Sequence, residues 1–204
     1  MTNVKFCGLR RPCDIEAANF LMPEYIGFVF APQSKRYITR ELALQLKKQL
    51  HPAISSVGVF VQENPKKVAA MLNDGIIDLA QLHGNENESY IKNLRELTCK
   101  PIIKAFRIDS LQDILEAEAS SADFILLDSG TGGTGTTFDW TLLQHIQRPY
   151  FLAGGLNLQN ISAALQTLKP YAVDVSSGIE THGYKDKEKM REFIRFVRNE
   201  TGKE

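Results

Sequence analysis

Val4-Lys5-Phe6-Cys7-Gly8-Leu9, close to the start of the chain, is typical of a β-strand that ends at a glycine. Alternation with a period of two puts Val4 and Phe6 on one face of this strand and Lys5 and Cys7 on the other. Strands of a parallel sheet are covered on both faces and are mostly apolar, so a face with an amine and a thiol is unusual. The polar face therefore indicates a functional site, with Cys7 as a candidate catalytic base.

The rest of the chain repeats a short apolar strand followed by an amphipathic helix. Strands are predicted at residues 4–7, 25–30, 56–61, 77–82, 101–106, 123–128, 150–153 and 172–175. Helices are predicted at residues 12–22, from 39 onward, and at 64–75, 87–98, 110–120, 139–146, 158–168 and 186–199. Polar residues that favour N-caps begin four of these helices, namely Thr39, Asn64, Asn87 and Ser110.

Eight strand–helix units without a break in composition predict right-handed βαβ connections and a parallel sheet. We therefore expect an α/β fold, a single-domain (β/α)8 TIM barrel over residues 1–204. The alternative is an open, doubly wound sheet. That fold is disfavoured because no Gly-x-Gly-x-x-Gly motif follows the first strand.

Composition excludes several classes of protein. The 204 residues are 43% hydrophobic, and 24 basic residues balance 24 acidic ones, so we expect no nucleic-acid or membrane partner. No apolar run reaches the roughly 18 residues of a membrane span, and charged residues interrupt the N-terminus, so a cytoplasmic protein is expected. Three cysteines without metal-ligand spacing argue against disulfides and against a zinc site.

Polar residues interrupt the predicted strands, mostly near the carboxyl ends where barrel enzymes carry their sites. These residues are Lys5, Cys7, Gln81, His83, Lys104, Asp128, Asp174 and Ser176. The first and eighth strands become neighbours when a barrel closes, so Lys5 and Asp174 are predicted to form a buried pair. Lys5 can also lower the pKa of the Cys7 thiol. His83 is expected to pack and to form hydrogen bonds rather than to catalyse.

Two glycine-containing loops predict an anion site. Gly154-Gly155 follows the seventh strand and Ser177-Gly178 follows the eighth, where many barrels bind phosphate. Glycine lets backbone N–H groups approach an anion closely. The alternative is that both are tight turns that simply require glycine.

Two further loops have candidate roles. The glycine-rich run from Gly130 to Gly135 suggests a lid over substrate, or a plain connector. Lys35 and Arg36 lie in the polar loop 32–37, where a guanidinium could bind a substrate carboxylate with two hydrogen bonds. Most exposed Lys-Arg pairs are only solvated surface.

Several motifs together resemble the phosphoribosylanthranilate isomerases of tryptophan biosynthesis. They are Lys5-x-Cys7-Gly8, Gln81-Leu82-His83-Gly84, Leu127-Asp128-Ser129-Gly130 with Gly132-Gly133-Thr134-Gly135, Ala153-Gly154-Gly155-Leu156, and Asp174-Val175-Ser176-Ser177-Gly178-Ile179-Glu180. They run in order from the first strand to the last. As a set they are highly specific, although no single motif would be.

The resemblance implies a cofactor-independent and metal-independent Amadori rearrangement of N-(5′-phosphoribosyl)anthranilate to 1-(2-carboxyphenylamino)-1-deoxyribulose 5-phosphate. It implies that Asp128 is the general acid that opens the furanose ring and that Cys7 is the general base at C2′. It further implies that Arg36 binds the anthranilate carboxylate. The remaining substrate-binding residues are expected to be His83, Gly154, Gly155, Ser177 and Gly178.

Other functions remain open from the residues alone. A sugar-phosphate epimerase would require metal ligands at strand ends, and the related histidine-pathway isomerase would have Asp in place of Cys7. A non-catalytic barrel that binds a phosphorylated metabolite would bind without turnover. The oligomeric state is left open between a monomer and a homodimer.

Overall fold

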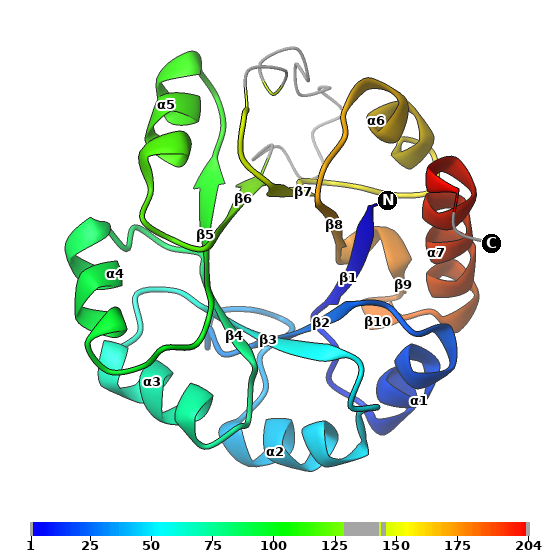
Figure 1. Cartoon of the computed structure of the whole chain (residues 1–204). Helices are drawn as coiled ribbons and strands as arrows, with labels where there is room; N and C mark the ends of the chain where they lie inside the picture. The colour runs from blue at the N-terminus through cyan, green and yellow to red at the C-terminus, as the bar shows by residue number, and fades with distance from the viewer. Residues whose placement is uncertain (1, 129–142, 144–145, 203–204) are drawn as a thin grey trace.

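The structure is a computed structural model that describes residues 2–128, 143 and 146–202. Eight parallel strands form a closed barrel in chain order, with helices around its outside (Figure 1). The strands are β1 (Asn3–Cys7), β2 (Tyr25–Val29), β3 (Ser55–Phe60), β4 (Leu79–Leu82), β5 (Ile102–Arg107), β6 (Phe124–Asp128), β7 (Tyr150–Ala153) and β8 (Ala172–Val175). The described helices are α1 (Pro12–Leu21), α2 (Arg40–Gln49), α3 (Pro65–Asn73), α4 (Glu88–Arg95), α5 (Leu111–Ala119), α6 (Ile161–Thr167) and α7 (Lys187–Thr201).

The pairing of β1 closes the barrel. Lys5 lies opposite Tyr25 of β2 on one side and opposite Asp174 of β8 on the other. This register confirms the (β/α)8 barrel and excludes the open sheet. The predicted helix at 139–146 and the glycine-rich run from Gly130 to Gly135 lie outside the described residues, apart from positions 143 and 146.

The predicted N-caps are confirmed. The side chain of each cap accepts a hydrogen bond from a backbone N–H two or three residues later, at Thr39, Asn64, Asn87 and Ser110. These bonds satisfy amides that the first turn of a helix leaves without a partner. Local side-chain chemistry therefore sets the starts of α2, α3, α4 and α5.

Some boundaries differ from the sequence-based expectation. The predicted strand 77–82 begins at Leu79, and the predicted helix 158–168 begins at Ile161. In the latter case, Asn157 and Asn160 make side-chain hydrogen bonds in the preceding turn, and such bonds compete with helix formation. The predicted helix 87–98 ends at Arg95.

A hairpin after β8 was not predicted. A single turn of 3₁₀ helix, Ser177–Ile179, leads into β9 (Glu180–Thr181), which pairs with β10 (Tyr184–Lys185). His182 and Gly183 connect them with φ values of 53° and 78°. Two consecutive positive φ values are characteristic of the tight hairpin turn that matches strand twist.

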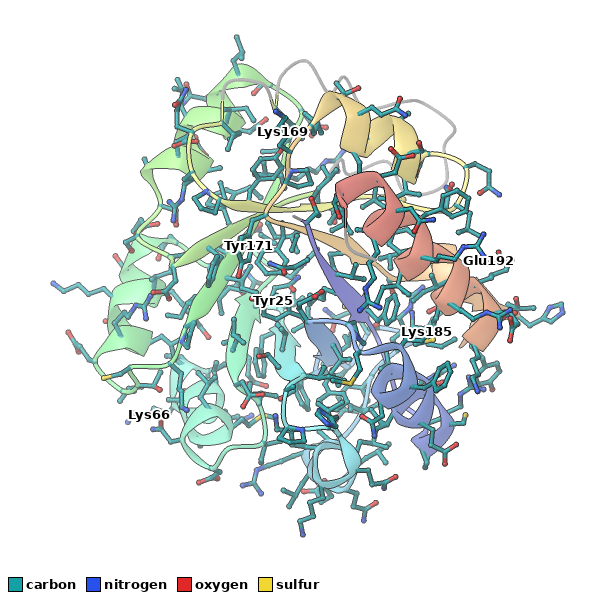
Figure 2. All side chains as sticks on the ribbon, turned by 45° about the vertical axis from the view of Figure 1, so that its right-hand side comes forward. Tyr25, Lys66, Lys169, Tyr171, Lys185 and Glu192 are labelled. Atoms are coloured by element: carbon teal, nitrogen blue, oxygen red, sulfur yellow. The ribbon has the colours of Figure 1, made fainter. Side chains whose placement is uncertain are left out.

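Aromatic rings close the amino-terminal end of the barrel. Tyr25, Phe124, Phe151 and Tyr171 pack with ring centroids 5.3 to 5.8 Å apart. The hydroxyls of Tyr25 and Tyr171 lie 2.9 Å apart, and Figure 2 shows both side chains near this end of the strands. Ring packing of this kind adds to the free energy gained by burying apolar area. The opposite end of the barrel is left to form the site.

A buried ion pair lies inside the barrel. Lys5 Nζ is 3.0 Å from both carboxylate oxygens of Asp174, and the side chains are 0% and 8% exposed. The prediction of this pair is confirmed. By contrast, Lys104 does not face the barrel interior with Ile103 and Ala105. It donates instead to the carbonyl of Gly84, because alternation along β5 turns it outward.

Removing one partner of the Lys5–Asp174 pair should destabilise the barrel strongly, because the other charge would remain buried without compensation. We expect Lys5→Met to lower the free energy of unfolding by about 3–5 kcal/mol in urea titrations. The matched control is Arg40→Met, since Arg40 and Asp74 form a pair whose side chains are 50% and 53% exposed. The control should cost less than about 1 kcal/mol, and equal losses in the two variants would contradict the buried role.

Candidate active site

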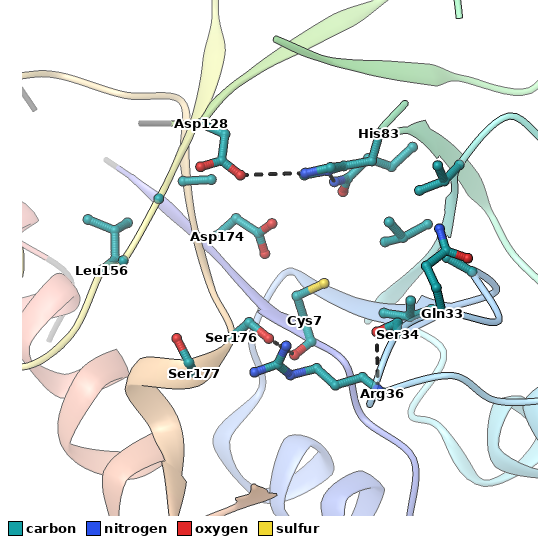
Figure 3. Close-up of a pocket in the computed structure, with 18 residues that line it drawn as sticks. Cys7, Gln33, Ser34, Arg36, His83, Asp128, Leu156, Asp174, Ser176 and Ser177 are labelled. Atoms are coloured by element: carbon teal, nitrogen blue, oxygen red, sulfur yellow. Dashed lines mark hydrogen bonds and ion pairs between the residues drawn. The ribbon is translucent and has the colours of Figure 1, made fainter. Parts of the chain in front are cut away.

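A cavity of about 560 Å³ opens at the carboxyl ends of the strands. Its volume suits a small-molecule ligand. Of the residues singled out from the sequence, the cavity is lined by Cys7, Gln81, Arg36, His83, Asp128, Gly154, Gly155, Asp174, Ser176 and Ser177. Figure 3 shows Asp128 and His83 along one side of this space, with Cys7 and Arg36 on another.

Cys7 is the last residue of β1 and is 9% exposed. Its neighbour across the sheet is Gly27 of β2, and a Cβ atom at Gly27 would lie 2.8 Å from the Cys7 sulfur. The absence of a side chain at Gly27 therefore makes room for the thiol. Sequence analysis missed this residue, although a glycine inside a strand often marks a close approach of this kind.

Burial is the largest influence on the pKa of the Cys7 thiol. Burial raises this pKa above its usual value, and the nearby Lys5 ammonium opposes the rise without cancelling it. The prediction that Lys5 lowers this pKa is confirmed for its own contribution, but the effect of burial is larger. Lys5 Nζ donates hydrogen bonds to both carboxylate oxygens of Asp174. The Asp174 carboxylate in turn raises the pKa of the Cys7 thiol.

Asp128 ends β6 and lies beside His83. His83 Nε2 is 3.4 Å from Asp128 Oδ2, and His83 Nδ1 is 2.8 Å from the amide nitrogen of Gln81. With the Gln81 amide assigned in this orientation, it donates to Nδ1, so a neutral ring carries its proton on Nε2 and presents it to Asp128. The buried Gln81 Oε1 atom has no hydrogen-bond partner in the described part of the chain.

Arg36 is held by an acidic residue that sequence analysis did not single out. Its Nε and Nη2 atoms each lie 2.7 Å from one carboxylate oxygen of Glu180. Lys185 donates to the same carboxylate at 2.6 Å. These two cations hold the pKa of Glu180 down to about 2, against the opposing effect of burial. A weak signal was available in the sequence, since glycine, and to a lesser degree histidine, adopts the positive φ values that the hairpin turn at His182-Gly183 requires.

The two glycine-containing loops border the cavity side by side. Gly154 and Gly155 have φ values of 92° and 66°, which favour glycine. The side-chain amides of Asn157 and Asn160 both donate to the Gly155 carbonyl, at 3.0 and 3.1 Å. Ser177, after β8, completes this wall of the cavity.

Gly178 does not line the cavity. A Cβ atom there would lie 2.1 Å from the Leu156 carbonyl oxygen, so this glycine allows the loops after β7 and β8 to pack closely together. The expectation that Gly178 takes part in phosphate binding stays a prediction. Gly178 acts on the cavity wall by letting the two loops behind it pack closely.

The cavity thus combines a thiol, a carboxyl group, a guanidinium and two backbone loops suited to anions. This set can exchange protons at two positions of a ligand that carries negative charge at both ends. Within the described residues, no three His, Cys, Asp or Glu side chains gather closely enough to bind a metal ion. No described helix is both long and apolar enough to cross a membrane.

Comparison with known proteins gives one consistent family. Residues 4–196 match the family described as N-(5'phosphoribosyl)anthranilate (PRA) isomerase. The N-(5'-phosphoribosyl)anthranilate isomerase of Endomicrobium trichonymphae is 44% identical over 203 residues, which cover 98% of this chain and 100% of the relative.

Solved structures agree. A phosphoribosyl anthranilate isomerase in complex with reduced 1-(o-carboxyphenylamino)-1-deoxyribulose 5-phosphate is 35% identical, with a TM-score of 0.86 and coverage of 99% and 100% of the two chains. A crystal structure of monomers of the dimeric phosphoribosylanthranilate isomerase from Thermotoga maritima is 34% identical, with a TM-score of 0.85 and the same coverage.

The Glu180 carboxylate should contribute stability that disappears in acid. Its pKa falls from 4.5 to about 2 on folding, so the contribution is complete above the unfolded value and is lost as pH falls toward 2. We expect Glu180→Gln to be less stable than wild type at neutral pH, and the difference to narrow between about pH 4.5 and 2. Urea unfolding at several pH values measures this. Glu188→Gln, which removes a carboxylate whose side chain is 62% exposed, is the control, and a Glu180→Gln deficit that did not vary with pH would contradict the pairing.

Proposed function

Because the chain belongs to the N-(5'-phosphoribosyl)anthranilate isomerase family, we propose that Cys7 and Asp128 are the base and the acid of its reaction. The enzyme is an isomerase of the aldose–ketose type in tryptophan biosynthesis. It converts N-(5′-phosphoribosyl)anthranilate to 1-(2-carboxyphenylamino)-1-deoxyribulose 5-phosphate. The observation that carries the proposed roles is that a thiol and a carboxyl group from opposite parts of the barrel, β1 and β6, line one cavity.

In the first step, Asp128 gives a proton to the furanose ring oxygen. The C1′–O4′ bond breaks as the nitrogen lone pair forms a C=N bond, and the ring opens to a protonated Schiff base. His83 supports this step because its Nε2–H group, 3.4 Å from Asp128, stabilises the carboxylate left behind. We therefore assign His83 to the positioning of Asp128, alongside its place in the cavity wall.

In the second step, the Cys7 thiolate removes the proton from C2′. The electrons of that C–H bond form a C1′=C2′ double bond, and the C=N electrons return to nitrogen, which gives an enolamine. Ketonisation then moves the enol proton away from oxygen and places a proton on C1′. The proton balance closes when Cys7 gives up a proton and Asp128 regains one.

Binding is proposed to hold the two ends of the substrate apart. Arg36 faces the cavity and can pair with the anthranilate carboxylate. The backbone amides of the loops at Gly154-Gly155 and Ser177 are suited to the phosphate, with Gly178 maintaining their packing. The ribose carbons would then lie between Cys7 and Asp128.

We further propose that residues 1–204 act as one catalytic domain in the cytoplasm, as a monomer or a homodimer. All three cysteines are free thiols, which is usual in a reducing compartment. The Thermotoga maritima relative described as dimeric supports testing for a homodimer by light scattering.

Substitution of either proton-transfer residue should nearly abolish turnover. We expect Cys7→Ser and Asp128→Asn each to lower kcat by about 100- to 10,000-fold, measured as the decay of phosphoribosylanthranilate fluorescence. Cys99→Ser, which alters an exposed cysteine far from the cavity wall, is the control and should retain full activity. Full activity in either test variant would overturn the role of that residue. Binding without turnover in wild type would favour the non-catalytic barrel.

The Cys7 thiol should ionise only in the alkaline range, because burial raises its pKa above the usual value. We expect its ionisation midpoint to lie above the usual thiol pKa of about 8.5. The difference in thiolate absorbance between wild type and Cys7→Ser gives this pKa directly. A midpoint below that of a free thiol would show instead that a cation dominates the environment of Cys7.

A further inference from the structure

The hairpin β9–β10 brings two charged residues to the back of Arg36. Glu180 pairs with Nε and Nη2 of Arg36 at 2.7 Å each, and its side chain is 10% exposed. Lys185 lies 2.6 Å from Glu180 and its side chain is 1% exposed. Three charged groups are therefore in direct contact, and only Arg36 lines the cavity.

Lys185 has no donor left for a ligand. Its Nζ atom donates to Glu180 Oε1, to the Ser176 carbonyl at 2.9 Å and to the Ser176 hydroxyl at 3.3 Å. An ammonium group has three N–H donors, so all of them are used. Any effect of Lys185 on substrate must act through Glu180 and Arg36.

The position of Arg36 is constrained from two sides. Glu180 occupies one edge of the guanidinium, and Nη1 makes no hydrogen bond to any residue that the structure describes. Behind the stem, a Cβ atom on Gly8 would lie 2.4 Å from Arg36 Cδ, so only glycine lets the side chain pass there. The edge formed by Nη1 and Nη2 is the one left to receive a second carboxylate.

The net charge of Arg36, Glu180 and Lys185 determines which ligands the Nη1–Nη2 edge of Arg36 attracts. Arg36 and Glu180 alone would be a neutral pair, with little attraction for another anion. Lys185 adds one positive charge, so the three groups together match a ligand with one negative charge. The cluster is partly shielded from water. Its net charge therefore attracts an anionic ligand more strongly than the same charge would on the surface.

We propose that Lys185 is a positioning residue that gives the Arg36–Glu180 pair its net positive charge and so sets specificity for the carboxylate on the substrate's aromatic ring. This inference rests on the proposed role of Arg36. It explains why an arginine already paired with a buried glutamate can still bind an anion. It also gives the hairpin β9–β10 a function in substrate selection.

The test compares two ligands on the same protein. One is reduced 1-(o-carboxyphenylamino)-1-deoxyribulose 5-phosphate, and the other is the phenylamino compound that lacks the ring carboxylate. The Kd of the phenylamino compound divided by the Kd of the carboxylate compound, both measured by calorimetry, reports the preference for the carboxylate. Lys185→Gln should reduce this ratio by about tenfold through weaker binding of the carboxylate ligand. Lys185→Arg keeps the charge and should preserve the ratio.

A double-mutant cycle with Arg36→Met separates the possible failures. If wild type shows no preference for the carboxylate ligand, the proposed role of Arg36 fails. If wild type shows the preference and Lys185→Gln keeps it, the inference about Lys185 fails alone. The inference predicts that Lys185→Gln has no further effect once Arg36 is replaced, because the two act through one contact.

A second measurement covers the case in which Lys185→Gln does not fold. Burial lowers the pKa of Lys185, whereas Arg36 stays charged. The carboxylate preference should therefore fall at alkaline pH and should persist in Lys185→Arg. Both proteins carry Cys7→Ser here, since the Cys7 thiol titrates in the same range, and Glu180 remains ionised throughout. An identical pH dependence in the two proteins would overturn the inference.

Discussion

The buried contact between Lys5 and Asp174 is the constraint on which the interior of this barrel depends. It joins the first and last strands, and it separates an apolar layer near the aromatic end from the smaller layer around Cys7, Val29 and Val59. Two charges that are almost fully buried require each other, so the strands that carry them must pair in one register. The same register places Cys7 and Ser176 at the rim, where the Ser176 hydroxyl donates to the Cys7 carbonyl at 3.1 Å.

The site follows from that arrangement, since a polar middle layer leads directly into a polar cavity. Cys7 lies one alternation above Lys5, and burial rather than the ammonium controls its protonation. Gln81 is hydrogen-bonded to His83, and His83 Nε2 lies 3.4 Å from the Asp128 carboxylate. Under the proposed function, the strand ends hold the proton-transfer groups and the loops hold the charged ends of the substrate.

Much of this could be read from the sequence, because local rules govern it. Thr39 and Asn64 cap helices by short-range hydrogen bonds, and the polar positions on β1 and β8 stand out against apolar strands. What could not be read depends on contacts between distant segments. Neither the partner of Arg36 nor the space that Gly27 leaves for the thiol is visible in a local pattern. The direction of the Cys7 pKa required the balance of burial against two opposite charges, which spacing alone does not supply.

The distance along the chain between Arg36 and Glu180, 144 positions, has a consequence for biosynthesis. During translation, the loop that carries Arg36 is made well before the hairpin that orients it. The side chains of Arg10 and Arg11 meet the same delay, since they donate hydrogen bonds to the carbonyls of Gly183 and Lys185. A nascent chain that lacks β8 and the hairpin therefore has the Cys7 thiol but not the oriented Arg36. Under the proposed function, selectivity for the aromatic acid is completed only when the segments that carry Arg36 and Glu180 meet.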